Sequence, residues 1–404
     1  MDDRKTLLLT EHVPRRFPRQ EIPGDVGTAL WRDYGSEVSV DFPSPKTDDH
    51  WELTAQGWVG YVPLTPEFGL SLQPKVPLDN LFRMLEYAYR LRSFRFLEDL
   101  VGCRSLEEFY ERLANVLARR VLDRARKGLY RAYLVEAEDL PYVRGRLDVR
   151  QLMQKPWSPK LHCHYEEHTP DVDENQILAW TLERVARSQM CSSRVQPTVR
   201  RAYHSLRGLA STTPFGPQDC VGRSYTRLND DYHPMHALCR FFLEHSGPTQ
   251  EMGDRTVLPF LVHMPRLFEL FVAEWLKAHL PESLTLSVQE KVAIGQPEHL
   301  QFKIDLVVSD AATGRPICVL DTKYRAQESP EAGDITQIMA YADMKDCTHA
   351  VLVYPQPLVQ PLDGWPGKSR IRVQSMVFSL DGDLEAAGRL FLDGLLGRLQ
   401  QSSG

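Results

Sequence analysis

The chain has 404 residues, which suggests about two or three domains and is ample for a buried core. Hydrophobic residues make up 42% and charged residues 25%, a globular composition that excludes a disordered, collagenous or coiled-coil protein. The net charge of −6 argues against a free-standing, non-specific nucleic-acid binder, because such proteins are usually basic. Any contact with DNA should therefore depend on a local patch or on a partner.

The seven cysteines are odd in number, widely spaced and without a CxxC pair. This usage indicates reduced thiols rather than a disulfide framework. No apolar run approaches the roughly 18 residues of a membrane span, and the acidic opening MDDRKTLLLTEH is not expected to act as a signal peptide. We therefore expect a cytoplasmic protein with no membrane contact.

The hydrophobic pattern predicts a multidomain fold of the α+β or α/β class. Short strands such as residues 38–42 predict a β-rich N-terminal region, residues 1–95. Apolar stripes at helical spacing over 106–127, 174–187 and 232–244 predict a mostly helical middle domain, residues 96–255, with a strand near 142–149. Residues 256–404 are expected to form the third domain.

The last third alternates helices and strands in a specific order. A helix is predicted over residues 265–279, strands over 284–292, 300–308 and 316–323, a second helix over 334–345, and a strand over 349–354. Asp334 is the expected N-cap of the second helix, because an Asp side chain can accept hydrogen bonds from free helical N–H groups.

Charged residues stand within two of these strands, where they are unusual. Asp305 lies mid-strand, and Asp321 and Lys323 share a face of the next strand because side chains alternate with period two. Asp is depleted in strands, and a buried charge is costly unless it is paired or bound to a metal. Carboxylate oxygens suit Mg²⁺, or Mn²⁺ in its place, and Lys323 could orient or deprotonate a metal-bound water. The alternative is a surface ion pair between Asp321 and Lys323.

The spacing D–(15 residues)–DxK resembles the PD-(D/E)XK nuclease superfamily, as does the order of helices and strands around it. The resemblance implies a restriction-endonuclease-like core that hydrolyses DNA phosphodiesters with Mg²⁺. It makes Asp305, Asp321 and Lys323 the catalytic set, and Glu269, on the preceding helix, a further metal ligand. Gln337 and Tyr341 share a helix face and resemble the QxxxY pair of the RecB-type branch.

Further segments resemble the McrC family, the nuclease subunits of 5-methylcytosine-dependent McrBC (type IV) restriction systems. They are LSLQPKVPLDNLFRMLEYAYRL (70–91), VRGRL (143–147), EHTPDVDENQIL (167–178) and LFELFV (267–272), and the match runs from about residue 50. The resemblance implies an McrB-like AAA+ GTPase partner, which this chain would stimulate, and double-stranded, methylated DNA as substrate. Residues 1–95 would then dock onto the partner.

GTP should bind to the partner and not to this chain. The sequence GKS at 367–369 is not a P-loop, because Leu362 stands where that motif needs Gly. Two alternatives remain open: a non-catalytic adaptor that only activates the GTPase, and a stand-alone nuclease.

Two groups of histidines and cysteines give weaker signals. His233, His236 and Cys239 lie three residues apart on one helix, which fits helix packing or part of a zinc site. The run His162-Cys163-His164 alternates faces along a strand, so that all three side chains cannot converge.

Overall fold

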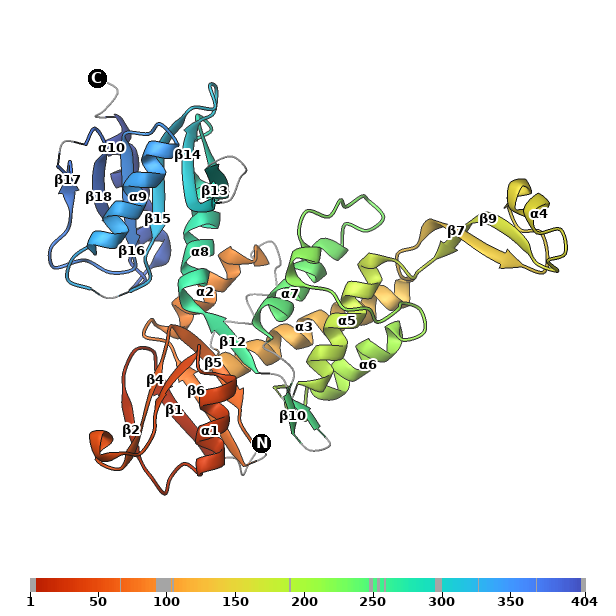
Figure 1. Ribbon diagram of the computed structural model, residues 1–404, viewed down its shortest axis with the longest axis horizontal. Coiled ribbons are helices and arrows are strands. Elements are labelled where there is room, and N and C mark those ends of the chain that lie inside the picture. Colours follow the sequence, from red (N-terminus) through yellow and green to blue (C-terminus); the bar gives the residue numbers. More distant parts are fainter. Residues whose placement is uncertain are drawn as a thin grey trace. The chain divides into compact units, whose positions relative to one another are not determined.

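The computed structural model describes residues 5–400 except 66, 92–102, 104, 189, 247–249, 253–254, 258, 295–299, 326 and 368. The chain divides into two compact units (Figure 1). One comprises Met1–Phe109 and Pro259–Gly404, and the other comprises Tyr110–Leu258. The first therefore joins the two ends of the chain. Whether residues 1–95 and 256–404 are separate domains within it, and 96–255 a third, stays a prediction.

The N-terminal part of the first unit is rich in strands, as predicted. Its elements are β1 (Lys5–Thr10), β2 (Arg15–Pro18), α1 (Gly24–Asp33), β3 (Val38–Asp41), η1 (Pro45–Thr47), β4 (His50–Ala55), β5 (Trp58–Pro63), β6 (Phe68–Gln73) and α2 (Leu78–Ala88). They form a sheet of order β2-β4-β3 and a second sheet of order β1-β6-β5-β12. The sequence analysis did not predict β12 (Phe260–His263), which supplies an edge strand from beyond residue 255.

Gly60 makes the β5–β12 pairing possible. Its φ is +137°, and a Cβ at this position would lie 2.0 Å from the carbonyl oxygen of Phe260. Only glycine allows the two backbones to approach so closely. Leu261 of β12 then joins the core that Leu7, Leu53 and Leu70 form beneath the two sheets.

The C-terminal part of the first unit contains every element predicted for it, with each boundary within two residues of the prediction. Its elements are α8 (Met264–His279), β13 (Leu284–Ile294), β14 (Leu300–Asp310), β15 (Pro316–Thr322), α9 (Ala332–Met344), β16 (His349–Tyr354), β17 (Asp363–Gly364), β18 (Arg372–Val377) and α10 (Leu384–Gln400). They build a six-stranded sheet of order β13-β14-β15-β16-β18-β17. Strands β13, β14 and β15 are antiparallel, whereas β15, β16 and β18 are parallel.

The middle of this sheet is apolar, which fixes the strands that carry the charged residues. All six residues of β16 are buried, as are the four residues from Cys318 to Asp321 in β15. Val307, Val319 and Leu352 of three neighbouring strands pack with Ile338 of α9. Burial of so much apolar surface holds the C-terminal end of β15 against the first turns of α9.

The second unit combines helices with a β-sheet arm (Figure 1). Its elements are α3 (Leu106–Lys127, which begins in the first unit), β7 (Ala132–Leu140), β8 (Arg146–Leu147), α4 (Val149–Gln154), β9 (Leu161–Thr169), α5 (Asp173–Arg187), α6 (Gln196–Leu206), η4 (Pro217–Cys220), α7 (Tyr232–His245), β10 (Gln250–Met252) and β11 (Arg255–Val257). Strands β7, β9 and β8 form the arm, which ends in α4.

The strand predicted near residues 142–149 is mostly wrong. Only Arg146 and Leu147 pair, as β8, because Gly145 turns the chain with φ +68° and Asp148 begins α4. A Cβ on Gly145 would lie 2.4 Å from the carbonyl oxygen of His164, so that this turn requires glycine.

Candidate active site

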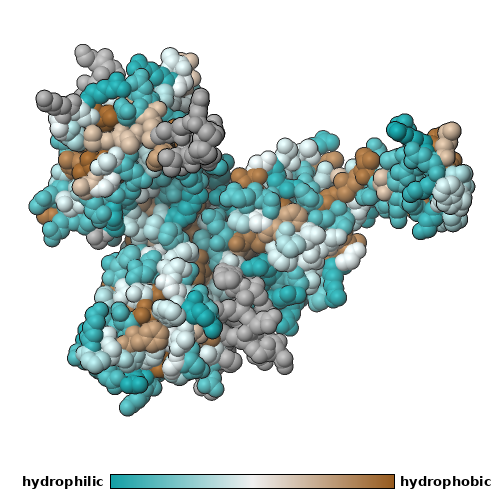
Figure 2. Space-filling view, in the orientation of Figure 1, coloured by the Kyte–Doolittle hydropathy of each residue, from teal (hydrophilic) through white to brown (hydrophobic). Residues whose placement is uncertain are grey.

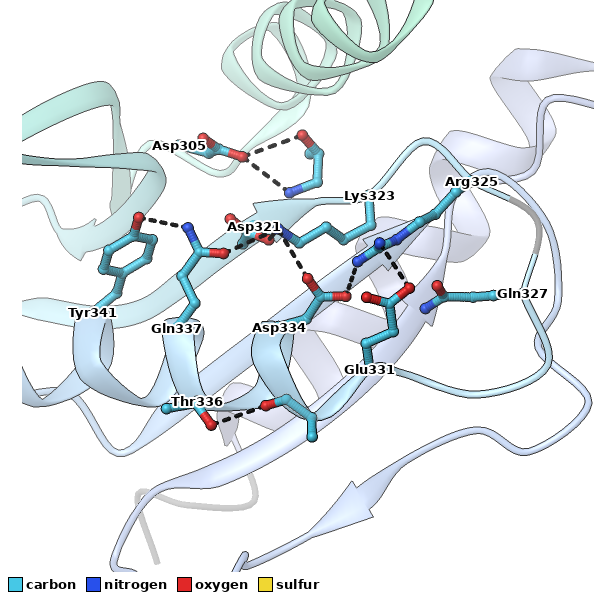
Figure 3. Close-up of polar contacts among 12 residues, drawn as sticks. Asp305, Asp321, Lys323, Arg325, Gln327, Glu331, Asp334, Thr336, Gln337 and Tyr341 are labelled. Carbon is cyan, nitrogen blue, oxygen red and sulfur yellow. Dashed lines mark hydrogen bonds and ion pairs between the residues drawn. The ribbon is translucent and has the colours of Figure 1, made fainter. Parts of the chain in front are cut away.

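Asp305 and Asp321 lie on neighbouring antiparallel strands, next to the paired residues Leu306 and Leu320 (Figure 3). Asp305 Oδ2 accepts hydrogen bonds from the backbone N–H of Thr322 at 3.1 Å and from its hydroxyl at 3.3 Å. Asp321 is only 3% exposed. The two strands therefore each hold one carboxylate near the C-terminal end of β15.

The folded protein disfavours the charged form of Asp321. Burial and the nearby charge of Asp305 raise its pKa to about 6, although Lys323 counters part of the shift. Its Oδ2 is buried without a partner at hydrogen-bond geometry, while the Lys323 ammonium lies 2.7 Å away as an ion pair. Such an oxygen retains lone-pair capacity for a cation.

Lys323 is surrounded by acceptors. Besides Asp321, its Nζ lies 3.4 Å from Asp334 and donates a hydrogen bond of 3.2 Å to Oε1 of Gln337. Burial alone would lower its pKa, but the two carboxylates outweigh burial and the pKa is raised. Lys323 is therefore an ammonium group at neutral pH, which favours orienting a water over deprotonating it.

Gln337 and Tyr341, which the sequence places on one face of α9, are in contact. Gln337 Nε2 donates a hydrogen bond of 2.8 Å to the hydroxyl of Tyr341, while its carbonyl oxygen faces Lys323 (Figure 3). Tyr341 is buried, so that its ring fixes the position of the amide. The relay Tyr341–Gln337–Lys323 links the helix to the end of β15.

Asp334 is not the N-cap of α9, although the sequence predicts that role for it. The N-cap of α9 is Glu331, and Asp334 lies buried in the first turn without capping it. Its carboxylate pairs with Lys323 and with Arg325, and Arg325 also binds Glu331 at 2.8 Å (Figure 3). The prediction failed because the ammonium and guanidinium groups after β15 compete for the carboxylate more strongly than free helical N–H groups do.

Glu269 is half-buried near Asp305 but already has partners. Its Oε1 accepts hydrogen bonds from Arg266 at 2.8 Å and from Gln289 Nε2 at 2.7 Å. Burial raises its pKa, and so does the charge of Asp305. Among the described residues, Glu269, Asp305 and Asp321 do not form a group whose ligand atoms all lie within 4.8 Å of one another.

Gln289 was missed by the sequence analysis. It has φ +53° within β13, and the pairing passes from Val288 with Leu306 to Glu290 with Ile304, which leaves Gln289 opposite Asp305. A non-glycine residue in the left-handed region costs on the order of 1–3 kcal/mol and often marks a functional site. No sequence signal could have found it, since glutamine has no preference for this conformation.

The helix that carries His233, His236 and Cys239 fits packing, not metal binding. Both ring nitrogens of His236 have partners, the hydroxyl of Tyr225 at 2.8 Å and the carbonyl oxygen of Glu174 at 3.0 Å. Burial lowers the pKa of His236 to about 4 and raises the thiol pKa of Cys239. His236 and Cys239 are therefore neutral parts of the core, whereas His233 is exposed.

Comparison with known proteins decides the family. Residues 53–355 match the family model described as "McrBC 5-methylcytosine restriction system component". The chain belongs to this family.

None of the described helices combines the length and the apolar character that a membrane span requires.

One curated relative is the Type IV methyl-directed restriction enzyme EcoKMcrBC of Escherichia coli K12. It is 25% identical over 221 residues, which span 53% of this chain and 62% of the relative. The match thus covers less than two thirds of that relative's length.

A solved structure resembles nearly the whole chain. It is a chain of the tetradecameric assembly of Thermococcus gammatolerans McrB AAA+ hexamers with bound McrC, at a TM-score of 0.55 and 18% identity, covering 97% of this chain and 100% of that chain. This likeness extends the shared fold over the N-terminal residues that the family model does not match.

Proposed function

We propose that the chain is the McrC-like nuclease subunit of a modification-dependent restriction system. It hydrolyses phosphodiester bonds of double-stranded DNA with Mg²⁺ and stimulates an AAA+ GTPase partner. The observation that carries the proposal is the placement of Asp305, Asp321 and Lys323 at one edge of the sheet. The order α8, β13, β14, β15, α9, β16 supports the restriction-endonuclease-like core expected around such a site.

The donor set fits a hard divalent cation. Asp305 and Asp321 offer carboxylate oxygens, one of them buried without a hydrogen bond. Glu269 lies close enough to Asp305 for the charge of Asp305 to raise the pKa of Glu269. These three residues would hold Mg²⁺, or Mn²⁺. The bound ion would lower the pKa of a water and stabilise charge on the phosphate.

The remaining residues would position the reacting groups. Lys323, as an ammonium, orients the attacking water and stabilises the developing negative charge, with Asp321 and Asp334 holding it in place. Gln337 fixes the direction of the ammonium, and Tyr341 fixes Gln337. The proposed role of Lys323 is thus electrostatic rather than that of a general base.

The partner is proposed from the similar proteins. The solved assembly is described as McrB AAA+ hexamers with bound McrC, and the curated relative as methyl-directed. We carry over to this chain an McrB-like GTPase that binds the GTP, and methylated DNA as substrate. The net charge of −6 supports a subunit that receives its DNA from a partner. Residues 1–95 are proposed to dock onto the GTPase.

An adaptor without nuclease activity is the second candidate. The observation in its favour is that Arg266 and Gln289 already bind Glu269, while Lys323 already neutralises Asp321. Asp321→Ala separates the two candidates. For a nuclease, the variant stops DNA cleavage and leaves stimulation of the GTPase intact. For an adaptor, neither the variant nor the wild-type chain cuts DNA with Mg²⁺, with or without the GTPase.

A further inference from the structure

The two faces of the arm sheet carry different side chains near its outer end. Cys163 of β9 points into a small cluster with Leu140 and Tyr165, whereas its neighbours His162 and His164 occupy the opposite face. Asp139 of β7 stands directly across from His162. Figure 2 shows hydrophilic side chains over much of the visible surface at this end of the arm.

Asp148 completes a group of three possible ligands on the face of His162 and His164. Its backbone N–H donates to the carbonyl oxygen of His162 at 2.9 Å, and its Oδ2 lies 3.9 Å from Nε2 of His164. One ligand atom each from Asp148, His162 and His164 lies within 4.8 Å of the other two. As the sequence predicts, His162, Cys163 and His164 do not all converge. Cys163 lies on the other face, and the two histidines meet the carboxylate that follows β8.

The ligands are oriented by other groups, as metal ligands usually are. Nδ1 of His162 lies 2.8 Å from Oδ1 of Asp139, which leaves Nε2 with a free lone pair. Oδ1 of Asp148 accepts the N–H of Gln151 at 3.0 Å, so that its carboxylate is fixed as the N-cap of α4.

We propose that Asp148, His162 and His164 bind a Zn²⁺ ion, with Asp139 orienting His162. Two imidazoles and one carboxylate form a three-residue set that leaves a fourth position for water or a partner's side chain. In a tetrahedral site with bonds of about 2.1 Å, ligand atoms lie roughly 3.4 Å apart, so binding would draw these groups together by about 1 Å. Rotation of the half-exposed His164 ring supplies that movement.

A bound Zn²⁺ ion would link the start of α4 to the arm sheet. Asp148 begins α4, while both histidines belong to β9. In the described part of the chain, the pairing of the two-residue strand β8 with β9 and the hydrogen bond from Asp148 to His162 already link the start of α4 to the sheet. The ion would further fix the outer end of the arm, a role separate from the proposed chemistry at Asp305 and Asp321.

The test is Zn²⁺ binding by the full-length chain after removal of metal with a chelator. Calorimetry is performed on a variant with Asp305→Ala and Asp321→Ala, so that the proposed nuclease site does not contribute. We expect one Zn²⁺ per chain, and a loss of affinity of at least about 100-fold when His162→Ala and His164→Ala are added. Co²⁺ in place of Zn²⁺ should give the visible absorption of a four-coordinate ion, lost in the same variant.

Two further variants control the result. His168→Ala removes a histidine from the same face of β9, where it stacks on Tyr133, and should leave Zn²⁺ binding unchanged. Asp148→Asn keeps the shape of the cap but removes the anionic ligand, and should weaken binding about 10-fold or more. Equal affinity in the chain with and without His162 and His164, binding of Fe²⁺ but not Zn²⁺, or no binding of Zn²⁺ at micromolar concentrations would overturn the proposal.

Discussion

The hydroxyl of Tyr324 donates a hydrogen bond of 3.1 Å to Oε2 of Glu11, which joins two residues 313 positions apart in the sequence. Tyr324 follows Lys323 directly, and Glu11 follows β1, where it forms a bridge with Ala55. Glu11 is fully buried, and burial raises its pKa. The N-terminal sheet is thereby connected to the segment that carries the candidate catalytic lysine.

Replacement of this hydroxyl should destabilise the protein in a pH-dependent manner. Tyr324→Phe removes a donor that favours the ionised form of Glu11, so that the loss of stability is largest above the raised pKa of this carboxyl. We expect the free energy of unfolding to fall by about 1–2 kcal/mol at pH 8 and by less at pH 4, measured by urea denaturation. Tyr142→Phe, at an exposed position, serves as the control. An equal loss at both pH values would contradict the coupling to Glu11.

Asp321→Asn should stabilise the chain at pH 8 in the absence of divalent ions. The folded-state pKa of Asp321 is raised from 3.8 to about 6, so the wild-type chain loses stability as the pH rises through this window. A rise of this size corresponds to about 3 kcal/mol, which already includes the opposing effect of the Lys323 ion pair. Thermal unfolding at pH 8 and pH 4 should show a gain only at pH 8.

Mg²⁺ gives the same substitution a second readout. A cation bound by Asp305 and Asp321 should raise the melting temperature of the wild-type chain at pH 8, because a ligand of the folded state stabilises it. The Asp321→Asn variant should show little of this effect. If both proteins respond equally to Mg²⁺, the ion does not bind at Asp321.

If the proposed function holds, Gln337→Leu should slow DNA cleavage and leave stimulation of the proposed GTPase partner unchanged. The substitution removes the hydrogen bond to the Lys323 ammonium but leaves its two carboxylate partners. Loss of such a positioning contact typically lowers activity about 10- to 100-fold. The variant is assayed for cleavage and for stimulation of GTP hydrolysis by the partner, with Thr336→Val, on the same helix, as the control. A fall in GTPase stimulation would place Gln337 in a structural role instead.

Local sequence pattern was sufficient to predict β14 and β15 and the charged residues that these strands carry. The alternation along residues 316–323 places Asp321 and Lys323 on one side, and the structure brings their charged groups to 2.7 Å. The four-residue spacing of Gln337 and Tyr341 likewise predicts the contact found between them. Such relationships depend on strand and helix periodicity, which the sequence expresses directly.

Contacts between distant segments could not be predicted in this way. The pairing of β12 with β5 and the hydrogen bond between Tyr324 and Glu11 depend on how separate elements pack. The place of Asp334 depends on its ion pairs with Lys323 and Arg325, which no single-residue preference describes. The left-handed backbone at Gln289 runs against the preference of its residue type.

The most direct test of the proposed function is cleavage of methylated and unmethylated DNA with Mg²⁺, with and without an McrB-like GTPase and GTP. It compares the wild-type chain with Lys323→Ala. We predict cutting of methylated DNA only in the complete mixture, and its loss in the variant while GTPase stimulation persists. Cutting by Lys323→Ala at the wild-type rate, or no cutting in the complete mixture, would contradict a nuclease site at Asp305, Asp321 and Lys323.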